Sequence, residues 1–278
     1  METHISTHST GQLAASFAVI PVNPGDLKIP VFNLSHYATS EHRVRCFCPE
    51  CGANVMDFEQ SDGMWRICTG IMDETQGLLK RDQIWLEDTL DGGQALWLEG
   101  IGERFMVGNG SEVVQQNHAI FKAPNPVSPI MSEERLLGRC HCGEVEFGVG
   151  APPTGERYDA GIDTCTSCRL TTGFELTAWT SVPLEKVQMT SGAPLNLSMN
   201  SLKRYSSSLG VQRYFCEHCG ATIFVGKDDQ SWIDIAVGLF RADEGARAER
   251  WLKWNEVGFP DEATDQNLIT TLRKGLKA

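Results

Sequence analysis

The sequence lacks any continuous run of the roughly 20 apolar residues that a membrane-spanning helix needs. Its first ten residues also lack a basic stretch followed by an apolar one, so no secretory leader is predicted there. We therefore expect a chain without membrane association, located in the cytoplasm.

Basic residues are scarce relative to acidic ones: 24 Lys and Arg stand against 36 Asp and Glu, which gives a formal net charge of -12. A negative field of this size repels phosphate backbones, so nucleic acid is not an expected partner. Hydrophobic residues make up 41% and charged residues 22%, a balance that excludes long disorder and low-complexity repeats. The length of 278 residues favours two globular domains.

Cysteine is abundant for such a chain, with ten residues. Reducing compartments do not sustain structural disulfides, so ten cysteines in a cytoplasmic protein indicate metal binding or redox chemistry. Their spacing decides which of these applies.

The sequence repeats itself. Residues 10–21 match residues 172–183 at one constant offset, and residues 37–53 match residues 205–221 with aromatic and cysteine positions in register. A repeat of this length indicates two copies of one domain and not a solenoid, whose period is about 20 to 50 residues. We predict a degenerate, N-terminally incomplete copy over 1–120, a Pro-rich linker over 121–135 and a complete copy over 136–278.

Both copies are expected to be mostly β. Short apolar segments lie between Gly, Pro, Asn and Asp residues, as in strands joined by turns. The expected strands are 14–22, 44–47, 145–149, 176–182, 221–225 and 232–237. A C-terminal helix is predicted over 265–276, with its apolar face packed on the sheet.

Two paired-cysteine motifs in the second copy predict a structural zinc site. Cys140-x-Cys142 and Cys216-x-x-Cys219 supply four thiolates, and the glycine after Cys219 permits the positive φ that such a turn often needs. The alternative is two pairs of buried thiols without metal, but packing alone hardly explains two paired motifs in one small β domain.

A second cluster, Asp163-x-Cys165-x-x-Cys168, offers three ligands. A zinc ion with three protein ligands keeps a position for substrate or water, which is typical of a catalytic site. The alternative is a redox pair or idle thiols, with Asp163 as a turn residue. The adjacent Arg169 either holds the carboxylate of an anionic substrate or is a solvated surface arginine.

The first copy lacks counterparts of residues 138–145 and 163–169. In the sequence comparison Thr3 and Ser6 fall where Cys165 and Cys168 would be, so the ligands of the second cluster are missing. Either the copy is degenerate and shapes the mouth of the site in its partner, or the given sequence starts too late to contain its front end.

Cys48 and Cys51 of the first copy correspond to half of the structural site. His4 and His8, four residues apart, could complete a site of two thiolates and two imidazoles. The alternative is an N-terminus that takes no part in metal binding.

Three segments of the second copy carry a resemblance to a known family. They are Gly-Arg-Cys-His-Cys-Gly-Glu-Val at 138–145, Cys-Thr-Ser-Cys-Arg at 165–169 followed by a Thr-Thr-Gly, and Tyr-Phe-Cys-Glu-His-Cys-Gly at 214–220. The chain resembles the glutathione-dependent formaldehyde-activating enzyme (GFA) family, also called the CENP-V/GFA domain. The resemblance implies two β-tent domains in tandem, stabilised by zinc, and covers about 136–257, with a weaker likeness over 9–97.

The resemblance also implies functional residues. Cys140, Cys142, Cys216 and Cys219 match the structural zinc ligands of the family. Cys165 and Cys168 match two of the three cysteines of its second zinc site, and Asp163 stands at the third position. A carboxylate is a harder ligand than a thiolate, so this site can differ in metal affinity or in the identity of the ion.

The activity implied by the resemblance is that of a carbon-sulfur lyase acting on S-hydroxymethylglutathione or a related thiol adduct, with glutathione as co-substrate. Asp163, Cys165 and Cys168 are then the catalytic metal ligands and Arg169 a substrate-binding residue. Two alternatives stand beside it: a non-catalytic, zinc-stabilised binding or scaffold module, and a GFA-like enzyme recruited to another small electrophile in a biosynthetic pathway. The sequence assigns no proton-transfer residue, since Glu175 and Arg169 are near the cluster only along the chain.

Overall fold

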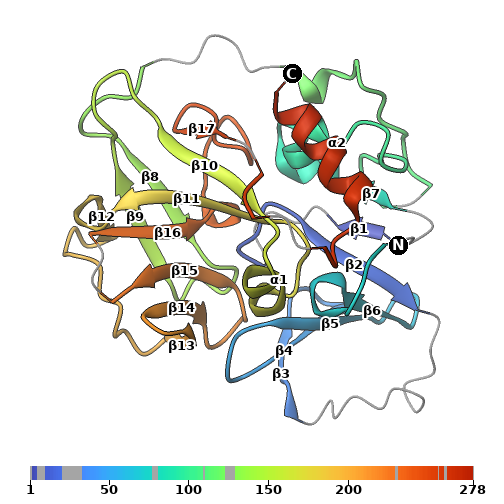
Figure 1. Ribbon diagram of the computed structural model, residues 1–278, viewed down its shortest axis with the longest axis horizontal. Coiled ribbons are helices and arrows are strands. Elements are labelled where there is room, and N and C mark those ends of the chain that lie inside the picture. Colours follow the sequence, from blue (N-terminus) through green and yellow to red (C-terminus); the bar gives the residue numbers. More distant parts are fainter. Residues whose placement is uncertain are drawn as a thin grey trace.

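A computed structural model of the chain describes residues 2–4, 10–20, 33–76, 81–108, 110–122, 129–228, 231–255, 257–259 and 262–277. Strands dominate, and two seven-stranded sheets lie beside one another (Figure 1). The mostly β prediction is therefore confirmed. Residues 123–128 of the expected Pro-rich linker lie outside the described residues, and the domain boundaries stay predictions.

The first sheet belongs to the N-terminal half and has the order β3-β4-β5-β6-β2-β1-β7. Neighbouring strands are antiparallel except for β1 and β7, which run parallel. The strands are β1 (Glu2–His4), β2 (Ala15–Ile20), β3 (Ser35–Ala38), β4 (Arg43–Phe47), β5 (Asn54–Glu59), β6 (Met64–Cys68) and β7 (Asp82–Ile84).

The second sheet has the order β13-β14-β15-β16-β11-β10-β17, again antiparallel except for its last pair. Its strands are β10 (Tyr158–Asp163), β11 (Thr177–Pro183), β13 (Leu202–Ser208), β14 (Val211–Cys216), β15 (Thr222–Lys227), β16 (Trp232–Ala236) and β17 (Leu252–Trp254). Position for position, the two sheets have the same order and strand directions, in agreement with the sequence repeat.

A third sheet, in the C-terminal half, has the order β12-β9-β8. It consists of β8 (Arg135–Arg139), β9 (Glu146–Gly150) and β12 (Val187–Met189). Phe147 of β9 packs on Phe224 of β15, with ring centroids 5.0 Å apart, so this small sheet covers the core of the second sheet. The turn from β8 to β9 carries Cys140 and Cys142.

Strand register corrects one detail of the sequence comparison. His4 pairs with Ala15, whereas Asp163 pairs with Thr177, the repeat equivalent of Ala15. His4 therefore occupies the position of Asp163, and the alignment of Thr3 and Ser6 with the two cysteines is wrong. The reason is a length difference: five residues separate His4 from Thr10, but eight separate Asp163 from Thr172.

In the described part of the chain, two α-helices accompany the sheets: α1 (Thr166–Thr172), which the sequence analysis did not predict, and α2 (Gln266–Leu276). The side chain of Asp265 caps α2 by accepting a hydrogen bond from the Asn267 N–H. The predicted C-terminal helix is thus confirmed, and its apolar residues Leu268 and Leu272 are buried in one core with strand residues of the second sheet. The helix also lies against the 3-10 helix η5 (Gly93–Trp97) of the first half, where Gly275 approaches the Trp97 backbone.

The remaining regular segments among the described residues are short 3-10 helices in the connections between strands. They are η3 (Thr69–Ile71), η4 (Leu86–Thr89), η6 (Ala119–Phe121), η7 (Leu184–Lys186) and η8 (Val237–Leu239). No helix among the described residues is both long and apolar enough to cross a lipid bilayer.

The two halves exchange equivalent hydrogen bonds. The Thr222 N–H donates to the Thr10 carbonyl at 3.0 Å, and the Asn54 side-chain amide donates to the Thr172 carbonyl at 3.0 Å. Thr10 and Thr172 are repeat equivalents, as are Asn54 and Thr222. Such mutual contacts are those of a two-fold symmetric dimer, here built within one chain.

Glycines allow the backbones of the two halves to approach each other closely at this junction. The Gly70 N–H donates to the Gly173 carbonyl at 2.8 Å, and the Gly238 N–H donates to the Gly11 carbonyl at 3.1 Å. Gly173 ends α1 at φ 89°, and a Cβ built there would lie 2.0 Å from the Asn54 carbonyl oxygen. The close approach therefore requires glycine.

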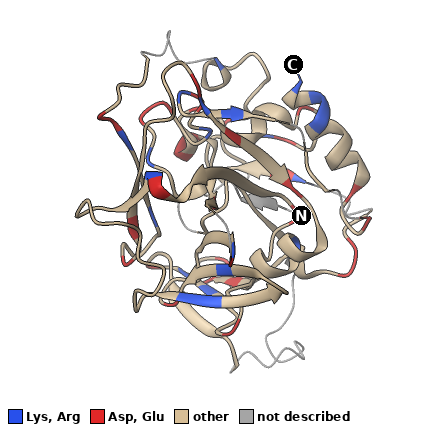
Figure 2. Cartoon of the chain, turned by 60° about the vertical axis from the view of Figure 1, so that its left-hand side comes forward, with Lys and Arg blue, Asp and Glu red and all other residues tan. Residues whose placement is uncertain are grey.

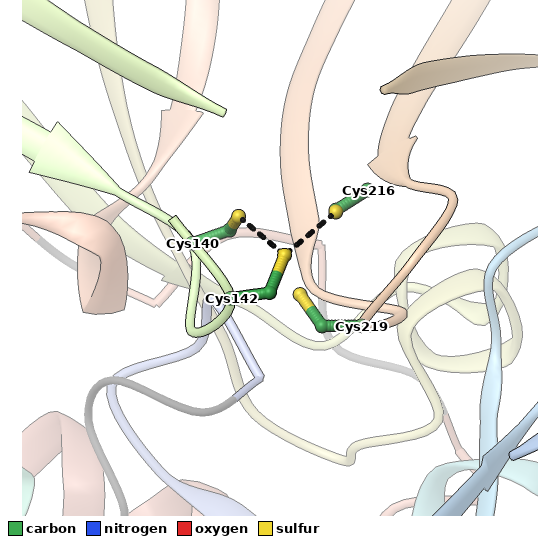
Figure 3. Close-up of side chains that lie close together, drawn as sticks. All are labelled: Cys140, Cys142, Cys216 and Cys219. Atoms are coloured by element: carbon green, nitrogen blue, oxygen red, sulfur yellow. Dashed lines mark hydrogen bonds between the residues drawn. The ribbon is translucent and has the colours of Figure 1, made fainter. Parts of the chain in front are cut away.

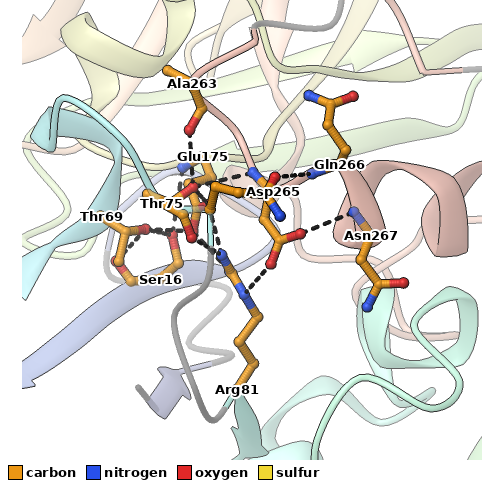
Figure 4. Close-up of polar contacts among 10 residues, drawn as sticks. Ser16, Thr69, Thr75, Arg81, Glu175, Ala263, Asp265, Gln266 and Asn267 are labelled. Atoms are coloured by element: carbon orange, nitrogen blue, oxygen red, sulfur yellow. Dashed lines mark hydrogen bonds and ion pairs between the residues drawn. The ribbon is translucent and has the colours of Figure 1, made fainter.

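A buried ionic network also joins the halves (Figure 4). Glu175 is fully buried and accepts hydrogen bonds from both terminal nitrogens of Arg81, at 2.9 and 3.1 Å. Thr69 and Thr75 donate to the same carboxylate, and Asp265 lies 3.3 Å from the Arg81 Nε. The Arg81 cation thus lies between two carboxylates in a site with little access to water.

We expect Gly173→Ala to destabilise the fold by about 2 kcal/mol more than Gly155→Ala, because only Gly173 meets the opposite backbone. Gly155 has a similar φ of 81° with open space around it, so its substitution measures the backbone strain alone, about 1 kcal/mol. Urea unfolding measures both. Equal losses would contradict the close crossing of the two halves.

Arg81→Leu should lower the free energy of unfolding by about 3–5 kcal/mol, because it leaves the Glu175 carboxylate buried without its cation. The surface pair Arg250 and Glu134 is a matched control, and Arg250→Leu should cost about 1 kcal/mol or less. The double variant Arg81→Leu with Glu175→Leu should recover part of the loss. A loss from Arg81→Leu no larger than that of the control would show that the network contributes little.

Candidate metal centres

Four cysteines converge from two turns of the second half (Figure 3). Cys140 and Cys142 lie in the turn that follows β8, whereas Cys216 ends β14 and Cys219 lies in the turn before β15. The structure therefore brings together the two motifs that the sequence predicts as one site.

The sulfur positions fit a tetrahedral metal site. The Sγ atoms of Cys140 and Cys142 are 3.4 Å apart, those of Cys142 and Cys216 are 3.5 Å apart, and all four lie within 4.8 Å of one another. A tetrahedron with Zn–S bonds of about 2.3 Å has edges of about 3.8 Å. Cys140, Cys216 and Cys219 are fully buried, so the donor set is that of a closed structural zinc site.

The first half supplies the surroundings of this cluster. Arg45, which is 1% exposed, donates from Nη1 to the Cys219 carbonyl at 3.0 Å. The Tyr37 hydroxyl lies 2.8 Å from Nδ1 of His141, the residue between the first two cysteines. Burial, together with the nearby Arg45, lowers the pKa of His141 and favours its neutral form. Four thiolates would carry more charge than one divalent ion, and the buried Arg45 cation would offset part of the excess.

The first half repeats one of the cysteine turns. The Gly52 N–H donates to the Cys48 carbonyl at 3.0 Å, as the Gly220 N–H does to Cys216 at 2.9 Å. Burial raises the pKa of Cys51 to about 11, which favours the thiol. Among the described residues no third ligand joins Cys48 and Cys51. His8 and the side chain of His4, the expected partners, lie outside the described part of the chain.

The second cluster forms where β10 meets α1. Asp163 ends β10, Cys165 precedes the first residue of α1, and Cys168 lies in its first turn. The Asp163 carboxylate accepts a hydrogen bond from the Cys165 N–H at 2.7 Å, and the three potential ligand atoms lie within 4.8 Å of one another. The structure thus gathers the three predicted ligands of the second site.

The two thiols of this cluster differ. A hydrogen bond from the Cys168 thiol lowers the pKa of Cys165 to about 7, and the Cys168 N–H donates to the same sulfur at 3.4 Å. Cys168 has a raised pKa, because it donates to Cys165 and is buried. Near neutral pH Cys165 is therefore the readier thiolate, and thiolates are both metal ligands and nucleophiles.

Arg213, which the sequence analysis did not single out, lies beside this cluster. It is 7% exposed and donates from Nη2 to the Cys168 sulfur at 3.4 Å and to the Ser167 hydroxyl at 3.1 Å. Its Nη1 has no hydrogen-bond partner among the described residues. No motif marks Arg213, because β14 brings it to α1 through long-range strand pairing.

Arg169 and Glu175, both near the cluster in sequence, face the junction of the halves. Arg169 is 4% exposed and donates from Nη1 to the carbonyls of Gly70 and Met72, at 2.7 and 2.6 Å. These contacts fix α1 against the first half. Glu175 belongs to the buried network with Arg81.

A pocket of about 290 Å³ opens next to the second cluster. Asp163 and Cys168 form one side of it, and Trp179 lies in its wall. Further polar side chains that line it are Asp159, Ser181, Asp234 and Asn255. Figure 2 shows acidic and basic residues interspersed over the chain, but the charged side chains that line this pocket are all acidic.

The fold and the site define a mostly β domain with one closed four-cysteine cluster and one three-ligand cluster beside a pocket. Residues 135–254 match the family model described as glutathione-dependent formaldehyde-activating enzyme. The second half of the chain is thus similar to this family.

The chain was also compared with solved structures and with curated proteins. A crystal structure of a Rhodobacter sphaeroides protein is similar at 21% sequence identity, covering 43% of this chain and 99% of that one, with a TM-score of 0.31. No curated protein matches the chain.

Cys219→Ala should remove one zinc ion per chain and unfold the second half, because it empties a site whose binding energy is of order 10 kcal/mol. Cys46→Ala is the matched control: Cys46 is also buried, but burial and Asp57 raise its pKa to about 12, so it stays a neutral thiol outside the cluster. Zinc content and thermal melting are the readouts. An unchanged melting temperature for Cys219→Ala, or after chelation, would contradict the structural role.

Proposed function

We propose that the chain is a zinc-dependent carbon-sulfur lyase that acts on S-hydroxymethylglutathione or a related thiol adduct. The observation that carries the proposal is the cluster of Asp163, Cys165 and Cys168, two of whose members, Asp163 and Cys168, line a pocket. The match of residues 135–254 to a family named for glutathione-dependent chemistry supports it.

The two clusters have different roles in this proposal. Cys140, Cys142, Cys216 and Cys219 hold a structural zinc, since their site is closed by four thiolates. Asp163, Cys165 and Cys168 hold a second ion with a position left for substrate. Zinc bound there supplies Lewis acidity to a substrate oxygen or stabilises a substrate thiolate. Reduced thiols in both sites agree with a cytoplasmic location.

The chain's own residues prepare this site. Arg213 holds Cys168 by a hydrogen bond and places a positive charge where thiolate charge gathers. Arg169, expected to bind a substrate carboxylate, acts in this proposal by fixing α1 on the first half.

The pocket also limits what enters. Asp159, Asp163 and Asp234 all line it, and glutathione is itself an anion. The carboxylates of the tripeptide are therefore repelled from the pocket, and only the cysteinyl sulfur with its one-carbon substituent should enter.

A second candidate follows from the carboxylate at the third ligand position. With Asp163 at the third position, the cluster is a harder ligand set than three thiolates would be. This difference favours an enzyme recruited to another small electrophile. The two candidates are separated by comparing two turnover rates: that of the formaldehyde adduct of glutathione and that of the formaldehyde adduct of a small neutral thiol such as 2-mercaptoethanol. Faster turnover of the neutral adduct favours the second.

Purified protein should hold two zinc ions per chain, and Cys165→Ala should hold one. The variant should lose cleavage of the glutathione-formaldehyde adduct while its melting temperature changes little, because Cys165 is only half-buried, at the start of α1. Exchange between adduct and free formaldehyde, followed by NMR, measures the activity. One zinc ion in the wild type and no effect of Cys165→Ala would instead indicate a non-catalytic binding module.

A further inference from the structure

A row of side chains crosses the second sheet beside the pocket. Arg213 of β14 pairs with Val225 of β15, Val225 pairs with Asp234 of β16, and Asp234 pairs with Ser181 of β11. Residues directly opposite one another project to the same face of a sheet. Asp234 therefore faces the pocket that Cys168 also lines.

The Asp234 carboxylate is held at one oxygen. The Ser181 hydroxyl donates a hydrogen bond to its Oδ1. The described residues make no other hydrogen bond or ion pair to Asp234, and the side chain is half-buried. Its second oxygen is thus available to a molecule in the pocket.

The surroundings of Asp234 favour proton exchange. Burial raises the pKa of Asp234, and the negative charge of Asp163 raises it further. The hydrogen bond from Ser181 and the positive charges of Arg213 and Lys227 lower it. The net result is a raised pKa. These groups come from the four strands around it. A carboxyl group whose pKa is raised toward the working pH is the more effective acid and base.

We propose that Asp234 is the proton-transfer residue of the thiol-adduct reaction and that Ser181 is its positioning residue. This assignment rests on the proposed function. Asp163 is less suited, because its carboxylate already accepts the Cys165 N–H and belongs to the ligand group.

In the cleavage direction the substrate is a thiol adduct, HO–CH2–S–R. The Asp234 carboxylate accepts the hydroxyl proton, the electron pair of the O–H bond forms the second C–O bond, and the C–S bond breaks with its pair moving to sulfur. Asp234 then returns the proton to that sulfur. The products are formaldehyde and the thiol, so atoms and electrons balance without another reactant.

Asp234→Asn tests the assignment, because the amide keeps the acceptor for Ser181 and removes the exchangeable proton. We expect kcat/KM for adduct cleavage to fall about 10²–10⁴-fold. Zinc content and melting temperature should equal those of the wild type. In the pH–rate profile of the wild type, the rate should fall as the pH drops through the raised pKa of Asp234, since the base form is required. This fall at acidic pH, the acidic limb of the profile, should be absent in the variant.

Two further variants sharpen the test. Asp228→Asn removes an exposed carboxylate just after β15 and should leave the rate and its pH profile unchanged. Ser181→Ala should cause a smaller loss than Asp234→Asn and shift the acidic limb, while Ser181→Thr, which keeps the hydroxyl, should restore both.

The outcomes are distinct. An active wild type with Asp234→Asn as active as Asp228→Asn contradicts the role of Asp234 and leaves the proposed function standing. Loss of zinc or of melting temperature in Asp234→Asn assigns a structural role instead and also overturns the proposal. A wild type inactive on every thiol adduct refutes the proposed function, and the role of Asp234 falls with it.

Discussion

The structure of the second half depends on four sulfur atoms that meet at one point. They tie the turn after β8 to the turn between β14 and β15, and so attach the small third sheet to the second sheet. Without an ion, four thiolates within this distance would repel one another and four thiols would leave weak polar contacts in the core. A metal ion bound by all four sulfurs would cross-link these two turns, and its binding free energy would stabilise the folded domain.

The first half completes that arrangement although it lacks a full set of ligands among its described residues. Arg45 reaches the Cys219 carbonyl, and the crossing of Gly70 with Gly173 places η3 against the end of α1. Arg169 donates to carbonyls on the other side of the same junction. The three-ligand cluster at the start of α1 is therefore held from both halves. An open site needs such support, because its ligands are not fixed by a fourth protein ligand.

Local features of the site were predictable from the sequence, and long-range ones were not. Cys140 with Cys142, Cys216 with Cys219, and Cys165 with Cys168 are close in the chain, so spacing alone indicates metal binding. Arg213 reaches Cys168, and Asp234 reaches the pocket, through the pairing of β14, β15, β16 and β11, which no short motif encodes. The same applies to α2: its capping Asp265 and apolar face predict the helix, but its partner η5 lies far away in the sequence.

The most direct test of this account is anomalous diffraction from crystals at the zinc absorption edge. The account predicts two peaks per chain: one about 2.3 Å from each of four cysteine sulfurs, and one bound by Asp163, Cys165 and Cys168. Sulfurs dispersed in the electron density, or cysteines joined as disulfides with no anomalous peak between them, would contradict it.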